Sequence, residues 1–209
     1  MPPKAFVRMR YQGNAQSSVS TAGAPTVLTF NASSIHNPEP SGTRQPDYFD
    51  QWAKFYGRYR VLGCLIKVRC SNPATSNTQI VSLHATDETL EVSPAWTNFL
   101  NFQRHKRMPD MKSGWLRPFG ENDPNDGGNI RWLKMYRSTR SMVGKGHDVE
   151  ELEGVLDDSG GSTDPAHMWT YKLTHCAADF ATTVTLNYHF VMEFNVLLSD
   201  LKLPVTATD

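Results

Sequence analysis

The sequence is short of cysteine, and this excludes a scaffold held together by disulfide bonds. Its 209 residues include only three cysteines, Cys64, Cys70 and Cys176. Cys64 and Cys70 fall in one expected strand, about 20 Å apart, which is too far for a bridge. We expect all three cysteines to behave as small buried hydrophobic residues.

Long apolar runs are also missing. No run approaches the roughly 20 residues that cross a bilayer, and the start, Met1-Pro2-Pro3-Lys4, lacks the apolar segment of a secretory signal. These features predict a soluble intracellular protein with no membrane partner.

No constellation of residues suited to catalysis is present. There is no Gly-x-Ser-x-Gly elbow and no phosphate-binding Walker loop. The seven histidines lack the spacing of a zinc or cupin site. We therefore expect no enzyme activity, no metal site and no cofactor.

The formal net charge is zero, but the charges are segregated along the chain. Residues 1–146 carry 19 Lys and Arg against 10 Asp and Glu, whereas residues 147–164 carry seven acids and no Lys or Arg. The acids of the 144–165 loop do not follow the spacing of an EF-hand, so we interpret this loop as an exterior acidic segment rather than a calcium site. Such segregation predicts a protein with two chemically different sides.

Alternation of apolar and polar residues indicates strands along most of the chain. It is clearest over residues 182–196, where seven apolar side chains share one face: Val184, Leu186, Tyr188, Phe190, Met192, Phe194 and Val196. Residues 60–70 repeat the pattern, with a predicted core face of Leu62, Cys64, Ile66, Val68 and Cys70. Further strands are expected at residues 5–11, 26–30, 79–85, 114–118, 130–137 and 168–175.

Two segments are expected to be helical. Residues 47–56 follow a proline and place Tyr48, Trp52, Phe55 and Tyr56 at helical spacing. Residues 93–100 begin with a serine cap followed by proline. Eight strands with short helices in the connections predict an all-β fold, a single antiparallel jelly roll of two four-stranded sheets. We divide the chain into a short arm with the first strand (1–25), a jelly-roll domain (26–198) and a tail (199–209).

Residues 45–52 (QPDYFDQW), followed by residues 55–68 (FYGRYRVLGCLIKV), resemble a segment of the capsid proteins of circular Rep-encoding single-stranded DNA viruses, the circovirus-like group. The resemblance continues through residues 138–144, the acidic loop, Trp169 and the last strand, and covers about residues 26–198. It implies a subunit that self-assembles into a small icosahedral (T=1-type) shell around circular single-stranded DNA. It also implies residence in the virion and assembly inside the host cell, the nucleus being one candidate site; no host receptor is implied.

The chain departs from this family at its start. Relatives usually begin with a long arginine-rich arm that neutralises the genome, whereas the first 25 residues here hold only Lys4, Arg8 and Arg10 as basic residues. Either an arm is missing from this sequence, or another surface packages nucleic acid, or little is packaged.

The family also implies that the first, last, fourth and sixth strands form one sheet, which faces the shell interior. Alternation places a set of basic residues on the solvent side of that sheet: Lys4, Arg8, Arg10, Lys67 and Arg69, joined by Lys134 or else by Arg131 and Arg137. Glu193 is the one acid expected on this face of the last strand. Such a surface would bind single strands without regard to sequence and in a salt-dependent way, and the alternative is an ordinary solvated face.

A second basic cluster, Arg104, Lys106 and Arg107, falls in a loop. It could contact genome, a neighbouring subunit or an import receptor, or it could be a plain solvated loop. Two other functions remain open at this stage: a lectin-like jelly-roll binding module and the coat of a small RNA virus.

Overall fold

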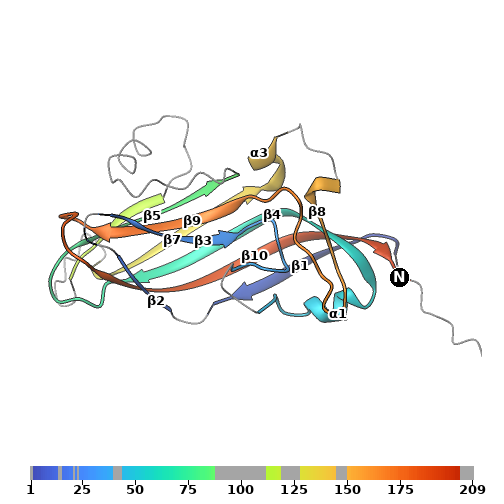
Figure 1. Cartoon of the computed structure of the whole chain (residues 1–209), viewed down its shortest axis with the longest axis horizontal. Helices are drawn as coiled ribbons and strands as arrows, with labels where there is room; N and C mark the ends of the chain where they lie inside the picture. The colour runs from blue at the N-terminus through green and yellow to red at the C-terminus, as the bar shows by residue number, and fades with distance from the viewer. Residues whose placement is uncertain are drawn as a thin grey trace, which may run out of the picture.

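Two antiparallel sheets lie face to face in the computed structural model, which describes residues 2–13, 16–20, 22, 24–39, 44–87, 112–118, 128–144 and 150–202 (Figure 1). The larger sheet has the order β1-β10-β4-β7: Ala5–Gln12, Thr185–Leu201, Tyr56–Ser71 and Ile130–Ser138. The smaller sheet has the order β3-β9-β5-β6: Thr26–Asn31, Thr170–Ala177, Gln79–Thr86 and Lys112–Leu116.

This connectivity is that of a jelly roll, and it confirms the predicted fold class. All eight expected strands are present. The larger sheet has six strands rather than four, because β2 (Gln16–Val19) pairs with β10 and β8 (Glu153–Val155) pairs with β4. The expected strand membership was wrong in one place: the third expected strand (residues 60–70) lies in the larger sheet, and the fourth (residues 79–85) lies in the smaller one.

The core lies between the two sheets, and β10 and β4 contribute the most residues to it. The alternation predicted over residues 182–196 is confirmed, since all seven predicted core residues are buried, six of them in β10 and Val184 just before it. Aromatic side chains meet across the interior: the rings of Phe30 on β3 and Phe190 on β10 have centroids 4.5 Å apart. Each such buried side chain contributes about 1.5–3 kcal/mol relative to an exposed one, so this seam holds the sheets together. The three cysteines are free and buried, as predicted.

A β-bulge in β4 changes which residues face the core. The pairing with β10 skips Leu62, because Asn195 pairs with Gly63 and Val196 with Val61. The extra residue reverses the alternation, so Val61 is buried and Leu62 is only half-buried. The placement of Leu62 on the core face was therefore wrong.

The helices are short. Helix α1 covers only Phe49–Ala53, because β4 already begins at the buried Tyr56, whose hydroxyl donates to the carbonyl of Pro2 at 3.0 Å. Helix α3 spans Thr139–Val143. Its N-cap residue is Ser138, whose side chain accepts a hydrogen bond from the Ser141 amide. A 3-10 turn, η1, spans Glu150–Leu152. The helix expected at residues 93–100 lies outside the described residues.

Candidate nucleic-acid interface

The solvent-facing side of the larger sheet collects the predicted basic residues, beginning with β1. Met9 and Tyr11 are buried, while Arg8 and Arg10 are exposed on the other side of the strand. Lys4, just before the strand, is also exposed. The predicted inward and outward faces of β1 are therefore confirmed.

The register of the central strands brings further cations onto the same face. Lys67 of β4 pairs with Val191 of β10, and Arg69 pairs with His189. On its other side, Lys67 pairs with Lys134 of β7. Paired residues of antiparallel strands point to the same face of a sheet, so Lys67, Arg69 and Lys134 are neighbours.

The sequence left open which side of β7 faces solvent, and in the structure it is the side that carries Lys134. Leu133 and Met135 are buried, and Lys134 between them is exposed. Arg131 points to the other side, where its side chain lies 2.0 Å from the position that a Cβ on Gly114 would take. Arg131 and Arg137 therefore do not belong to the basic face, and the alternative that placed them there was wrong.

Glu193 is surrounded by these cations. The Lys67 ammonium donates a hydrogen bond to its carboxylate at 2.8 Å. This bond, with the positive charges of Lys67, Arg8 and Arg10, lowers the pKa of Glu193 against the opposing effect of burial. Glu193 is thus a carboxylate at neutral pH and balances one of the six predicted cations.

The pairing of Lys67 with Lys134 is costly for a sheet, because like charges directly opposite one another are destabilising. Of these two lysines, Glu193 forms an ion pair only with Lys67. Within the described parts of the chain, neither Arg69 nor Lys134 forms an ion pair. A face with uncompensated cations is suited to bind an anion.

Sequence reasoning missed two basic residues, Arg58 and Arg60. Because the bulge reverses the alternation of β4, they share the outward side with Lys67. Arg58 lies 3.7 Å from Glu153 of β8, in a pair whose side chains are 50% and 15% exposed. The adjacent apolar residues Val61 and Leu62 fit either phase, so nothing in the sequence signals the reversal.

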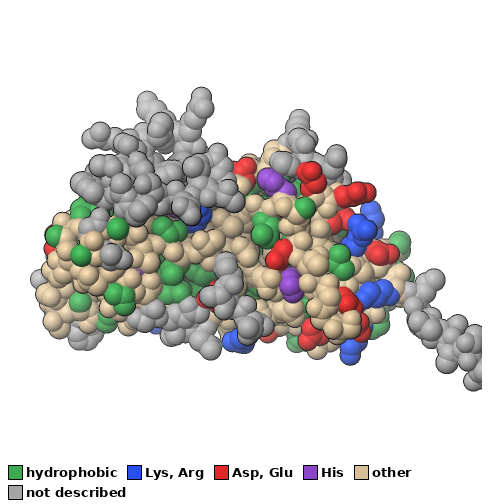
Figure 2. Space-filling model, in the orientation of Figure 1, with side chains coloured by type: hydrophobic (Ala, Val, Ile, Leu, Met, Phe, Trp, Pro, Cys, Tyr) green, Lys and Arg blue, Asp and Glu red, His purple; other side chains and the backbone are tan. Residues whose placement is uncertain are grey.

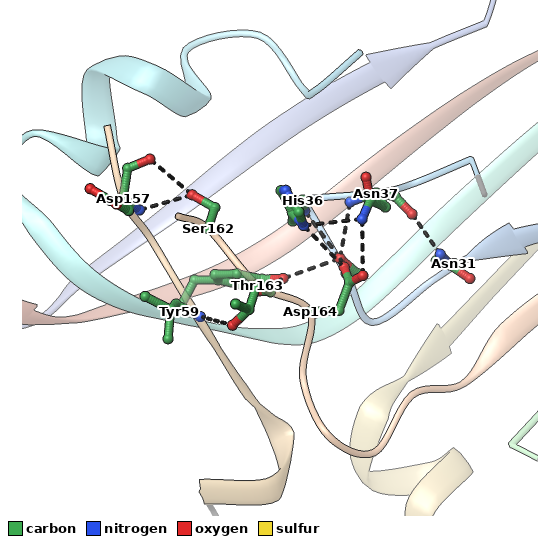
Figure 3. A network of polar contacts seen from close by, with 10 residues as sticks. Asn31, His36, Asn37, Tyr59, Asp157, Ser162, Thr163 and Asp164 are labelled. Atoms are coloured by element: carbon green, nitrogen blue, oxygen red, sulfur yellow. Dashed lines mark hydrogen bonds and ion pairs between the residues drawn. The ribbon is translucent and has the colours of Figure 1, made fainter. Parts of the chain in front are cut away.

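The acidic segment is partly structural. Figure 3 shows Asp164 at the centre of a polar network with residues 31–37. Its carboxylate accepts hydrogen bonds from the Asn37 amide at 3.0 Å and from the Ser34 hydroxyl, and it lies 3.7 Å from the ring of His36. Asp157 accepts hydrogen bonds from Ser159 and Gly161 within its own turn, which lowers its pKa. Both acids therefore hold the chain in place.

Charge is unevenly spread over the surface. On the face drawn in Figure 2, acidic and basic side chains gather at the end of the molecule where α1 and β8 lie in Figure 1. No group of acids, histidines and cysteines in the described ranges could hold a metal ion. Within those ranges, too, the helices are too short or too polar to cross a membrane. The second basic cluster, Arg104, Lys106 and Arg107, lies outside them.

Comparison with known proteins supports the fold. No protein-family model matches the chain, and no curated protein sequence matches it. Among solved structures, the chain is similar to the protein chain in the cryo-EM structure of a semi-empty virus-like particle of the nodavirus of the giant freshwater prawn, Macrobrachium rosenbergii. The TM-score is 0.51 and the identity 8%, over 97% of this chain and 97% of that one.

The structure of Mud crab tombus-like virus is similar to the same degree. Its TM-score is 0.51 and its identity 8%, over 97% of this chain and 92% of that one. Both likenesses extend over nearly the whole chain, and they establish that it has the jelly-roll fold of virus-particle proteins.

Proposed function

We propose that this chain is a viral capsid protein that self-assembles into a small icosahedral, T=1-type shell around a single-stranded genome. The observation that carries the proposal is the exposed, net cationic face on one sheet of a jelly roll, where Arg69 and Lys134 form no ion pair within the described residues. This face turns toward the shell interior, and the protein resides in the virion after assembly inside the host cell.

The face binds genome through its phosphates. It presents Lys4, Arg8, Arg10, Lys67, Arg69 and Lys134, with Glu193 among them and Glu153 beside Arg58 at the edge of the face. Each phosphate that meets a cation releases a condensed counterion, so affinity falls steeply as salt rises and does not depend on sequence.

For the genome, we propose circular single-stranded DNA, because the resemblance of residues 26–198 is to coats of that group. The alternative is RNA, which is favoured by the structural likeness to coats of small RNA viruses. Phosphate contacts do not distinguish the two. Reassembly of emptied particles with equal lengths of single-stranded DNA and RNA in competition separates them, because the proposal expects DNA to be retained in excess.

The double variant Arg69→Glu with Lys134→Glu tests the basic face. We expect shells of normal size by electron microscopy, with a lower ratio of nucleic-acid to protein absorbance than in the unmodified protein. Both residues lack an ion-pair partner in the described part of the chain, so the substitutions break no salt bridge there.

A matched control is Lys112→Glu with Arg140→Glu, which makes the same charge change at exposed sites on β6 and α3. Its absorbance ratio should stay normal. An unchanged ratio in the Arg69 and Lys134 variant contradicts the basic face as the genome interface. A protein that stays monomeric under all salt conditions contradicts the capsid proposal itself.

A further inference from the structure

Strand β7 presents large apolar side chains to solvent. On its outward side, Ile130 is 37% exposed, Trp132 62% and Tyr136 49%, with the exposed Lys134 between the two aromatic residues. Single exposed apolar residues are ordinary, but a row of them on one strand marks a binding surface.

Cations of β4 lie directly beside this row. Arg69 pairs with Trp132, and Lys67 pairs with Lys134. We name Trp132, Lys134, Tyr136, Lys67 and Arg69 together the aromatic-cationic stripe. All five point to the same side of the larger sheet, so a ligand laid along β7 meets rings and positive charges in alternation.

The two rings differ in how they are held. Tyr136 lies over β4, because its hydroxyl is 2.5 Å from the position that a Cβ on Gly63 would take. Covering a glycine is a structural role in itself. Trp132 is the more exposed ring and lies about 13 Å from Tyr136 along the strand, at roughly 3.3 Å per residue. Trp132 is therefore the better candidate for contact with a ligand.

The chemistry of the stripe selects one class of occupant. A second copy of the chain docked through an apolar patch would have to bury Arg69 and Lys134 as well, and burying charges is costly unless each finds a well-placed partner. A nucleic acid satisfies both halves of the stripe, its phosphates meeting the cations and its bases the rings. A duplex keeps the faces of its bases stacked inside, so only a single strand offers them.

We propose that the stripe stacks unpaired nucleobases, with Trp132 as the main platform, so that the subunit retains single strands over duplexes. This inference rests on the proposed function and deepens it, because it assigns a base-binding site beside the phosphate-binding cations.

The test uses emptied particles titrated with two labelled oligonucleotides of equal length and charge, one of oligothymidine and one abasic. Trp132→Leu should weaken oligothymidine binding by about tenfold, which corresponds to about 1.4 kcal/mol for the lost stacking of one base on an aromatic ring. Binding of the abasic strand should not change. Trp132→Phe keeps a ring and should retain most of the affinity, and the salt dependence should stay the same in both variants.

Trp115 provides a matched control, because it is 52% exposed on β6 of the smaller sheet. Trp115→Leu should bind both strands as the unmodified protein does. The inference is overturned if Trp132→Leu binds oligothymidine normally, or if it loses equal affinity for the abasic strand. It is also overturned if that variant blocks assembly while binding normally, because the occupant is then a second copy of the chain.

The Arg69→Glu with Lys134→Glu variant separates the two proposals. If it weakens binding of both strands while Trp132→Leu has no effect, stacking fails and the basic face stands. If neither variant alters binding, both proposals fail.

Discussion

The solvent-facing sides of the two sheets differ sharply. On the larger sheet this side is exposed and cationic. On β5 and β9 of the smaller sheet the corresponding residues are almost fully buried: Ile80, Ser82, His84, Lys172, Thr174 and Cys176, all at most 8% exposed. Polar residues alternate with apolar ones in both sheets, so polarity alone does not reveal which side of a strand meets solvent. Among the described residues, the broad polar surface open to a ligand is that of the larger sheet.

The largest effect is expected where the two sheets meet. Phe190→Ala removes a fully buried ring from the seam and should lower the free energy of unfolding by about 3–5 kcal/mol. Phe6→Ala, in the same sheet but 76% exposed, should change it by less than about 0.5 kcal/mol. Denaturant titration of dissociated subunits measures both, and similar losses would contradict a core confined between the sheets.

An intermediate effect is expected from acid, through the buried His175 of the smaller sheet. Its ring nitrogen lies 3.0 Å from the Ser18 hydroxyl, and burial lowers its pKa from 6.5 to about 4. The folded state therefore keeps His175 neutral, while the unfolded state takes up a proton below about pH 6.5. Stability is fully present above that pH and falls as the pH drops toward 4.

For His175 this loss is about 2 kcal/mol between pH 7.5 and pH 5. Denaturant midpoints at the two pH values should show a smaller fall in His175→Gln than in the unmodified protein. An equal fall in both proteins would mean that His175 is not protected from protonation.

The smallest effect on stability is expected on the cationic side. Glu193→Gln breaks the ion pair with Lys67. The Glu193 side chain is 26% exposed and the Lys67 side chain 36%, and ion pairs this exposed contribute at most about 1 kcal/mol to the free energy of unfolding. Removing the carboxylate should nevertheless tighten single-strand binding a few-fold at low salt, with the difference closing as salt rises. Fluorescence titration over a salt series checks this, and weaker binding would show that Glu193 positions Lys67 rather than opposing the ligand.

The fold was predictable because β10 alternates without interruption over its core-facing positions. The reversal in β4 was not, since a bulge leaves no mark where two apolar residues, Val61 and Leu62, are adjacent. The short strands β2 and β8 were missed because three or four residues carry too little periodicity.

The candidate site was partly predictable for a related reason. The inward residues Leu133 and Met135 alternate with Trp132, Lys134 and Tyr136, so both sides of β7 are rich in apolar residues and the phase stays ambiguous. The exposed rings of Trp132 and Tyr136, which made the orientation of β7 ambiguous in the sequence, are the same rings that make β7 a candidate for base stacking. A functional surface can thus weaken the pattern from which the fold is predicted.

The three free, buried cysteines have a consequence for the life of a particle. No covalent bond between side chains of this chain ties one strand to another, and the raised pKa of Cys64, caused by its burial, keeps that thiol protonated and unreactive. In a shell built from such subunits, as proposed, these buried thiols would form no disulfide between subunits. Release of its contents would then depend on salt, acidity and mechanical strain, and would need no reducing compartment.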